Sequence, residues 1–414
     1  MYALIDCDSF FVSCERLFRP DLATTPTVVL SNNDGCAVSR SKEAKPLIPM
    51  GGPVFKYKDV LEKNSVQCFS ANFHLYGDIS QRIIAIIEAE GFATEQYSVD
   101  EAFVIFDQMD RASALQWGEL LRKKIDQWVG VPVTVGIGRT KTIAKAHCEF
   151  LKDNGIGSDE NMDQDVILQK VAVEDVWGVG RRLAPKLRDY GIVTAYDLAR
   201  APERWLRSVG GIKLLRTSRE LAGEDCFGAS IQFNEPSKHT ISSTRTFGRR
   251  VTELYELESA IASFVSRASY RMRKSHKLAS GMVVFAHTNR FDTDFQKVST
   301  VIRFDEPLDH TGEIIEQALA AFAAVYKPGL AYKKAGVLLV DLVDRADRQV
   351  SLLKPQSTVE LEKSERLMHA LDSLKHEHGD VVRFGVQGPR KWHSIRSQQT
   401  PAYTTKWNDL PTVQ

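Results

Sequence analysis

The order of hydrophobic patterns between Tyr2 and Ile137 is the feature of this sequence that most constrains its fold. The patterns predict, in chain order, a strand at 2–7, a helix at 10–18, a helix at 79–88, strands at 94–98 and 102–106, a helix at 112–128 and a strand at 131–137. With residues 19–75 set aside as an insertion, the order is β-α-β-β-α-β, which is typical of a ferredoxin-like sheet. We therefore predict an α+β fold that begins with such a sheet.

The remaining segments predict further domains. The insertion at 19–75 contains a strand-like stretch at 27–30 and a turn at 32–35, which indicate a small subdomain mounted on the sheet. Residues 165–230 have helical patterns. A linker-like stretch at 233–236 then leads into a separate α+β region, with a helix at 257–274 and strands at 282–286, 300–304 and 335–342.

Composition excludes some protein classes. The chain has 414 residues, of which 43% are hydrophobic and 26% charged, as in multidomain globular proteins. No apolar run approaches the ~18 residues of a membrane span, so we expect a soluble, cytoplasmic protein with no membrane partner. The six cysteines include no C-x-x-C pair, which favours reduced thiols over a zinc site. Residues 231–303 contain twelve Lys and Arg against six Asp and Glu, which indicates a surface for a phosphate backbone.

Three carboxylates stand at the joints of the predicted sheet. Asp6 ends the first strand, and Asp100 and Glu101 lie between the two hairpin strands. If these strands are neighbours, the three side chains meet at one edge, where hard oxygen ligands could hold two cations for phosphoryl transfer. Each acid by itself could equally be a solvated turn residue or a backbone cap.

The residues around these acids resemble those of the Y-family DNA polymerases, UmuC branch. Ala3–Phe11 is similar to the first motif of the family, and Tyr97–Phe103 is similar to its second acidic motif. The resemblance implies that Asp6, Asp100 and Glu101 bind two Mg²⁺ ions, with the backbone carbonyl of Cys7 as a further ligand, and that dNTPs are the substrates. Asp8 could instead be a solvated turn carboxylate.

The resemblance also implies residues that bind the nucleotide. Phe11, next to Phe10, is the steric-gate candidate that excludes a 2′-hydroxyl, although one of the two rings must face the core of the first helix. Ser39 and Lys45 match the phosphate-binding positions of the fingers, and we predict that they lie on one face of a helix. A solvated basic helix is the alternative.

Lys141 is predicted as a third phosphate ligand. It follows Gly136-Ile137-Gly138-Arg139-Thr140, where a strand ends and a helix begins. The positive end of such a helix offers free amides to an anion. The glycine spacing differs from that of a Walker loop, so the assignment depends on the resemblance.

Several segments predict contacts with DNA and with partner proteins. Residues 176–187 have the pattern of a helix-hairpin-helix, in which Gly178, Gly180 and Arg181 would contact a phosphate, although a simple helical hairpin is the alternative. In the basic region, the expected backbone contacts are Arg245, Arg249, Arg250, Arg271, Arg273 and Lys274, each of which could equally belong to a solvated face. A stretch that resembles a sliding-clamp peptide consists of Gln349, Val350, Ser351, Leu352 and Leu353, with an edge strand as the alternative.

Together these features predict a right-hand DNA polymerase. The expected domains are a palm (1–18 and 76–164), fingers (19–75), a helical thumb (165–230), a linker (231–241), an α+β little finger (242–345) and a C-terminal tail (346–414). The resemblance implies error-prone translesion synthesis in the SOS response to DNA damage. It also implies primer–template DNA, a sliding clamp, a UmuD-type processed dimer and RecA as partners. A polymerase-like DNA-binding or checkpoint subunit, or a nucleotidyl cyclase, is the alternative.

Overall fold

The computed structural model describes residues 1–154, 163–228, 239–348, 358–388, 392 and 395–410. These residues form two compact units. One unit comprises Met1–Phe233 together with Ser397–Gln414, and the other comprises Asn234–Arg396. The second unit is therefore inserted in the chain of the first. Among the described residues, no helix is long and apolar enough to cross a membrane.

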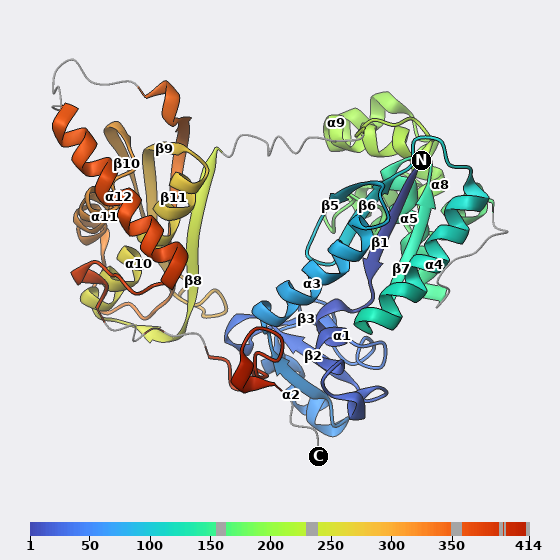
Figure 1. Ribbon diagram of the computed structural model, residues 1–414, viewed down its shortest axis with the longest axis horizontal. Coiled ribbons are helices and arrows are strands. Elements are labelled where there is room, and N and C mark those ends of the chain that lie inside the picture. The colour runs from blue at the N-terminus through green and yellow to red at the C-terminus, as the bar shows by residue number, and fades with distance from the viewer. Residues whose placement is uncertain (155–162, 229–238, 349–357, 389–391, 393–394, 411–414) are drawn as a thin grey trace. The chain divides into compact units, whose positions relative to one another are not determined.

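The first unit contains the predicted ferredoxin-like sheet (Figure 1). Its strands are β1 (Tyr2–Cys7), β5 (Ala93–Gln96), β6 (Glu101–Ile105) and β7 (Val133–Gly138), in the antiparallel order β5-β6-β1-β7. In the order of the four strands along the chain this is 2-3-1-4, as a β-α-β-β-α-β unit requires. The sequence prediction of the fold is confirmed, with strand ends displaced by one or two residues.

Side chains of β1 alternate between two helical layers, because successive residues of a strand point to opposite faces. Ala3, Ile5 and Cys7 pack in one core with helices α3 (Phe73–Glu88) and α4 (Arg111–Val129). Tyr2 and Leu4 share another core with helix α5 (Lys141–Asn154). Asp6 continues the Tyr2–Leu4 alternation, so its carboxylate is directed toward α5.

Two glycines allow α5 to lie close to β7. A Cβ atom on Gly136 would lie 2.3 Å from the carbonyl oxygen of Ala144, and one on Gly138 would lie 2.5 Å from the backbone nitrogen of Ala144. No side chain fits at such distances, so Gly136 and Gly138 are required for packing. The sequence had suggested instead that these glycines open a site for an anion.

The inserted subdomain is a small three-stranded sheet. It contains β2 (Thr27–Leu30), β3 (Ala37–Arg40), helix α2 (Val54–Lys63) and β4 (Gln67–Ser70), with the strand order β3-β2-β4. Helix α1 (Phe10–Arg16) precedes it. The prediction that Ser39 and Lys45 share a helix is wrong. Ser39 lies on β3, opposite Val29 of β2, and Lys45 lies in the turns that follow, because the ladder to β2 supplies the backbone hydrogen bonds.

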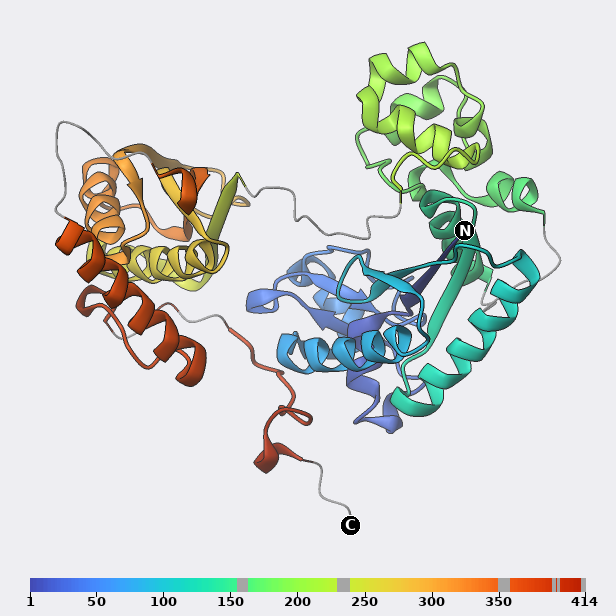
Figure 2. The ribbon, with the colours of Figure 1, turned by 45° about the horizontal axis from the view of Figure 1, so that its top comes forward.

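Four helices follow the sheet and form a bundle with its own core, drawn in green in Figure 2. They are α6 (Gln164–Lys170), α7 (Ala184–Asp189), α8 (Ala195–Ala199) and α9 (Glu203–Leu221). The helical prediction for 165–230 holds for the described residues. The expected helix-hairpin-helix differs in one arm, because the element before Gly178 is a single 3-10 turn, Val173–Asp175.

The second unit is an antiparallel sheet covered by helices (Figure 1). Its elements are β8 (Thr240–Val251), α10 (Leu254–Lys274), β9 (Lys277–His287), β10 (Lys297–Leu308), α11 (Thr311–Val325), β11 (Tyr332–Asp344) and α12 (Thr358–His378). The strand order is β10-β9-β11-β8. The sequence therefore predicted this α+β domain correctly, although β8 begins inside the stretch expected to be a linker.

The C-terminal region divides between the units. Helix α12 is joined to the second unit by Arg273, which is 8% exposed at its side chain and forms a bidentate ion pair with Asp372. Trp392 also belongs to the core of that unit. Residues 397–409 instead pack on the first unit, which a single tail at 346–414 did not anticipate.

Candidate active site

The three predicted carboxylates come together at the ends of β1 and β6. Asp6 and Glu101 are directly opposite each other in the ladder between these strands. The amide of Cys7 donates a hydrogen bond of 3.0 Å to the carbonyl oxygen of Asp100. Asp100 is held in turn by Ser98, whose hydroxyl donates to the carboxylate at 2.5 Å and accepts from the Asp100 amide at 3.2 Å. The convergence therefore follows from strand register.

A cleft of about 690 Å³ opens over this cluster. Its walls come from β1, α1, β3, the turns after β3, and α5. The predicted site residues that line it are Asp6, Cys7, Phe10, Phe11, Ser39, Lys45, Asp100 and Glu101. Asp8 also lines it, and its carboxylate accepts a hydrogen bond of 2.9 Å from the Thr134 hydroxyl. One concave surface thus collects eight of the nine residues that the sequence selected for metal and nucleotide binding, and Lys141 is the exception.

A row of lysines on α5 faces the carboxylates of the sheet. Lys141 pairs with Glu95 on β5 at 2.5 Å, and Lys145 pairs with Glu101 on β6. Lys152 pairs with Asp6 on β1 at 2.5 Å and lies 4.0 Å from Asp8. Each lysine meets a carboxylate on a successive strand. Positions 141, 145 and 152 are four and seven residues apart, so they share one helix face.

Lys152, rather than Lys141, is the basic residue that α5 brings to the cleft. Lys152 lines the cleft, whereas Lys141 is 3% exposed and lies between Glu95 and the rings of Tyr2 and Phe103. The prediction of Lys141 as a phosphate ligand is therefore wrong. The spacing of 145 and 152 by seven residues was the signal in the sequence that could have identified Lys152.

The N-terminus of α5, next to Lys141, already binds a carboxylate of this chain. Glu220 of α9 is fully buried, and its carboxylate accepts from the amides of Thr142 at 3.2 Å, Cys226 at 2.7 Å and Phe227 at 3.1 Å. The expected phosphate site at the start of α5 is thus occupied by a carboxylate, which links the sheet to the helical bundle. The N-terminus of α5 thus binds an anion, as its dipole favours, but the anion is a carboxylate of this chain.

Glu220→Gln is expected to destabilise the protein by about 2 kcal/mol or more, because the new amide group must face amide donors. Chemical denaturation measures this change. Glu224→Gln is the matched control, since Glu224 is 61% exposed at its side chain and lies 3.7 Å from Arg219. The control should change the free energy of unfolding by less than ~0.5 kcal/mol. Equal effects of the two substitutions would contradict the role given to Glu220.

Burial and like charge make the carboxylate cluster a place for cations. The pKa of Asp6 is raised to about 7, because burial, together with the neighbouring charge of Glu101, outweighs the opposing charge of Lys152. Burial lowers the pKa of Lys152, but Asp6, Cys148 and Asp8 together outweigh burial and raise it. Among the described residues, no group of three His, Cys, Asp or Glu side chains is arranged to hold a metal ion. Instead, the ammonium groups of Lys152 and Lys145 pair with Asp6 and Glu101. The carboxylate oxygens of the cluster are hard ligands of the kind that Mg²⁺ prefers.

Phe10 and Phe11 have different positions. Phe10 is 3% exposed and belongs to the core, as one of the two rings was expected to do. Phe11 lines the cleft and stacks on Tyr76, with ring centroids 4.5 Å apart and an interplanar angle of 16°. Phe73 contacts the same ring edge-on at 5.9 Å. Phe11 is therefore held by aromatic neighbours at the edge of the core to which Phe10 belongs.

The two phosphate-binding candidates of the inserted subdomain both line the cleft, but they differ in burial. Ser39 is 5% exposed, and its hydroxyl donates to the carbonyl oxygen of Ser9 at 3.1 Å. Lys45 is exposed at the rim of the cleft. Burial raises the pKa of Asp8, and the positive charge of Lys45 is among the effects that oppose this rise. Arg40 and Lys42 also line the cleft, so its wall is basic opposite the carboxylates.

The residues predicted to contact DNA differ in exposure and in ion pairing. Gly178 has φ of +88°, Gly180 has open space where a Cβ would lie, and Arg181 is exposed. In the second unit Arg249 pairs with the buried Glu256 at 2.5 Å, and Arg250 pairs with Asp292 at 2.9 Å.

Two other basic residues of the second unit differ in their exposure. Arg245 is half-buried on β8. Arg273 is structural, as its ion pair with Asp372 shows, so its prediction as a DNA contact is wrong. The predicted clamp peptide at 349–353 lies outside the described residues.

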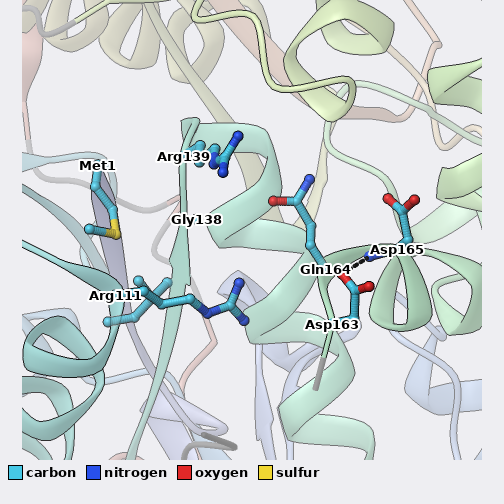
Figure 3. A pocket seen from close by; sticks show the side chains of 8 residues that line it. Met1, Arg111, Gly138, Arg139, Asp163, Gln164 and Asp165 are labelled. Atoms are coloured by element: carbon cyan, nitrogen blue, oxygen red, sulfur yellow. Dashed lines mark hydrogen bonds between the residues drawn. The ribbon is translucent and has the colours of Figure 1, made fainter. Parts of the chain in front are cut away.

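A second cavity, of about 560 Å³, lies near the start of α5 and α6 (Figure 3). Arg111 and Arg139 line it together with Asp163, Gln164 and Asp165. It contains none of the predicted site residues, and its acidic groups belong to the start of α6, where Asp163 caps the Asp165 amide at 3.3 Å. The carboxylate cleft is therefore the better candidate for a reaction centre.

Comparison with family models agrees with this organisation. Residues 5–149 match the impB/mucB/samB family, and residues 238–352 match the C-terminal domain of the same family. Residues 365–413 match a domain of unknown function, DUF4113. The first match contains all the carboxylates of the cleft, and the third contains the segment that returns to the first unit.

Similar proteins cover the full chain. The chain is 36% identical to "Protein UmuC" of Salmonella typhimurium over 100% of both chains, and 36% identical to "Protein MucB" of Escherichia coli over 99% of both. A "DNA polymerase IV" of Corynebacterium diphtheriae is 33% identical over 48% of this chain and 45% of that protein.

Solved structures show the same fold. A Y-family DNA polymerase chimera of Dbh superposes with a TM-score of 0.63 at 16% identity, covering 83% of this chain and 99% of that one. An insertion ternary complex of the Dbh DNA polymerase superposes with a TM-score of 0.51 at 19% identity, with the same coverage.

Proposed function

The chain belongs to the impB/mucB/samB family, and from that premise we propose that it is a DNA-directed DNA polymerase of the Y-family UmuC branch. Its activity is template-directed translesion synthesis in the response to DNA damage. One observation supports the assignment most strongly: Asp6 lies opposite Glu101 in a cleft that Phe11, Lys45 and Lys152 also line. Such a cleft has a place for cations, for a sugar and for a triphosphate.

The carboxylates of Asp6, Asp100 and Glu101 would hold two Mg²⁺ ions, with the carbonyl of Cys7 as a further ligand. When bound, divalent ions activate the primer 3′-oxygen and neutralise the charge of the triphosphate. The ladder between β1 and β6 fixes the backbone of this ligand set, and Ser98 orients Asp100. Lys152 and Lys145 neutralise Asp6 and Glu101 in the protein alone.

The basic wall of the cleft would bind the triphosphate. Lys45 is exposed there, and Lys152 can turn from Asp6 toward a phosphate once cations neutralise the carboxylates. Ser39 would have to exchange its hydrogen bond to Ser9 for one to a phosphate oxygen. These residues bring positive charge to the place where negative charge develops in the transition state.

Phe11 is the steric gate of the proposed site. Because Tyr76 and Phe73 hold its ring at the cleft wall, a ribose 2′-hydroxyl would collide with it. Phe11→Ala is expected to lower the preference for dNTP over rNTP roughly 10- to 100-fold, measured as the ratio of kcat/KM values. Phe73→Leu is the comparison variant, since Phe73 contacts the gate from behind. An unchanged preference in Phe11→Ala would refute the assignment.

The remaining domains would hold DNA and partners. The turn at Gly178–Arg181 and the basic residues Arg245, Arg249 and Arg250 are proposed to contact the phosphate backbone without base preference. On the similarity to UmuC, we also propose that the protein is cytoplasmic, that residues 349–353 dock on a sliding clamp, and that activity depends on a UmuD-type dimer and RecA.

Primer extension tests the proposal. The full-length chain, with and without clamp, UmuD-type dimer and RecA, is supplied with Mg²⁺ and dNTPs on undamaged and abasic templates. We expect template-directed extension on both templates, abolished by chelation of the metal. An absence of extension under every combination would leave the alternative of a DNA-binding subunit that acts through partner assembly.

A further inference from the structure

The segment Ser397–Asp409, which follows the second unit in the chain, docks on the first unit directly behind the gate. The amide of Ser70 donates to the carbonyl oxygen of Gln398 at 3.0 Å, and the amide of Gln398 donates to the Ser70 hydroxyl at 3.0 Å. A parallel bridge between Ser70 and Gln399 extends the pairing. The segment therefore adds to the end of strand β4 through its backbone.

Side chains on both sides strengthen this docking. The Asp34 carboxylate accepts from the amide and hydroxyl of Ser397, at 3.0 and 2.9 Å. Tyr403 stacks on Phe18, with ring centroids 4.4 Å apart. The Ala402 amide donates to Asp409 at 3.0 Å, which closes the end of the segment into a compact turn. Polar and aromatic contacts thus hold the segment along its length.

Asn72 connects the segment to helix α3. Asn72 is 2% exposed, and its side-chain nitrogen lies within hydrogen-bond distance of the carbonyl oxygens of Thr400 and Pro401 and of the Thr400 hydroxyl, at 3.1 to 3.2 Å. Its side-chain oxygen accepts from the Leu75 amide and caps α3. The same residue therefore fixes both the start of α3 and the position of Thr400.

A buried carboxylate carries the contact from Thr400 to the gate. Glu15 is fully buried, and its Oε1 accepts from the Thr400 hydroxyl at 3.3 Å and from the Tyr76 hydroxyl at 2.6 Å. No hydrogen bond reaches its Oε2 from the described residues. Tyr76 is fully buried as well, and its ring is the one on which Phe11 stacks. Glu15 and Phe11 are four residues apart on α1 and so face α3 together.

We propose that the C-terminal segment is a positioning element for sugar discrimination, in which Thr400 holds Glu15 and Tyr76 and thereby fixes the ring of Phe11. This proposal rests on the proposed polymerase function and on Phe11 as its gate. It gives the part of DUF4113 that returns to the first unit a role in selecting the substrate. Thr400 and Glu15 do not line the cleft, so they act through Tyr76.

A buried carboxylate without an ion pair needs hydrogen-bond donors to hold it in one orientation. Among the described residues, Glu15 has no ion pair and keeps only hydroxyl donors, so removal of one donor leaves the other to reorient the group. The rings of Tyr76, Phe11 and Phe73 contact one another, so a shift of the Tyr76 ring is passed on to the ring of Phe11. A change at Thr400 therefore reaches Phe11 through two residues, Glu15 and Tyr76.

Thr400→Val in the full-length chain tests the proposal, since valine keeps the shape of threonine and removes the hydroxyl. We expect the ratio of kcat/KM for dGTP to that for GTP to fall about 3- to 10-fold, with little change in kcat/KM for dGTP. Thr400→Ser should restore the ratio. Tyr403→Ala, which weakens the docking and leaves Thr400 intact, should lower the ratio as well. Thermal melting establishes that each variant is folded.

The outcomes are distinguishable. If Thr400→Val keeps the wild-type ratio while Phe11→Ala lowers it, the positioning role is wrong and the gate stands. If Thr400→Val lowers kcat/KM for dGTP and GTP equally, or Thr400→Ser fails to restore the ratio, the segment is only structural and the proposal is overturned. Failure of the wild-type protein to incorporate dGTP on any template would instead overturn the proposed function.

Discussion

Asp100→Asn is expected to abolish primer extension, with a loss of at least ~10³-fold in kcat, because divalent ions stabilise the transition state by several kcal/mol and asparagine supplies no negative oxygen to hold them. The substitution keeps the shape of the side chain and its neighbour Ser98. The backbone bond between the Cys7 amide and the Asp100 carbonyl does not involve the side chain. The fold should therefore persist while the chemistry is lost.

Asp107→Asn is the matched control for this variant. Asp107 is an exposed carboxylate just beyond the opposite end of β6 and does not line the cleft. Single-turnover extension on a primed template, at saturating Mg²⁺, measures both proteins, and DNA affinity is measured separately. Asp107→Asn should retain wild-type kcat. Synthesis by Asp100→Asn at more than a tenth of the wild-type rate would exclude the proposed metal site.

Lys152→Met is expected to lower activity and Lys141→Met to lower stability, although the two lysines lie on the same face of α5. Lys152 lines the cleft, so its loss should lower kcat/KM for dNTP by ~10²-fold or more, as removal of one charged group that stabilises the transition state does. Lys141 is buried against Glu95, so its loss leaves an uncompensated carboxylate. That change should lower the free energy of unfolding by about 3–5 kcal/mol.

Two measurements separate these effects. Urea denaturation should find Lys141→Met much less stable than Lys152→Met. Extension kinetics, normalised to the folded fraction, should find near wild-type kcat/KM for Lys141→Met. A large loss of activity in folded Lys141→Met, with none in Lys152→Met, would return the phosphate-binding role to Lys141.

The sequence predicted the sheet because its determinants are local. The short apolar run in Tyr2–Cys7 and the helical spacing in 112–128 are properties of neighbouring residues. Strand register then follows from burial, since a slip by one residue would exchange the side chains that β1 directs into its two cores and would turn Asp6 away from α5. Asp6, Asp100 and Glu101 could be identified from their places near the end of one strand and the start of another, together with the family resemblance of the residues around them, and antiparallel pairing brings those ends together.

The predictions that were wrong concern residues whose roles depend on contacts with other helices and strands. Ser39 was expected on a helix, but its strand is fixed by pairing with Val29 of β2. Gly136 and Gly138 suggested an anion site, but the close approach of α5 requires them. Arg273 appeared to belong to a basic surface, and a carboxylate 99 residues away neutralises it. In each case the competing contact comes from another helix or strand, which the pattern within one segment does not identify.

By itself, the sequence determined the order of strands and helices, the carboxylates at the ends of β1 and β6, and the aromatic pair that follows Asp6. Only the tertiary structure decided which lysine of α5 reaches the cleft, which carboxylate caps that helix, and that residues 397–409 return to lie behind Phe11. The physical reason is that hydrophobic periodicity is encoded within a few residues, whereas ion pairs and caps form between side chains that folding alone brings together.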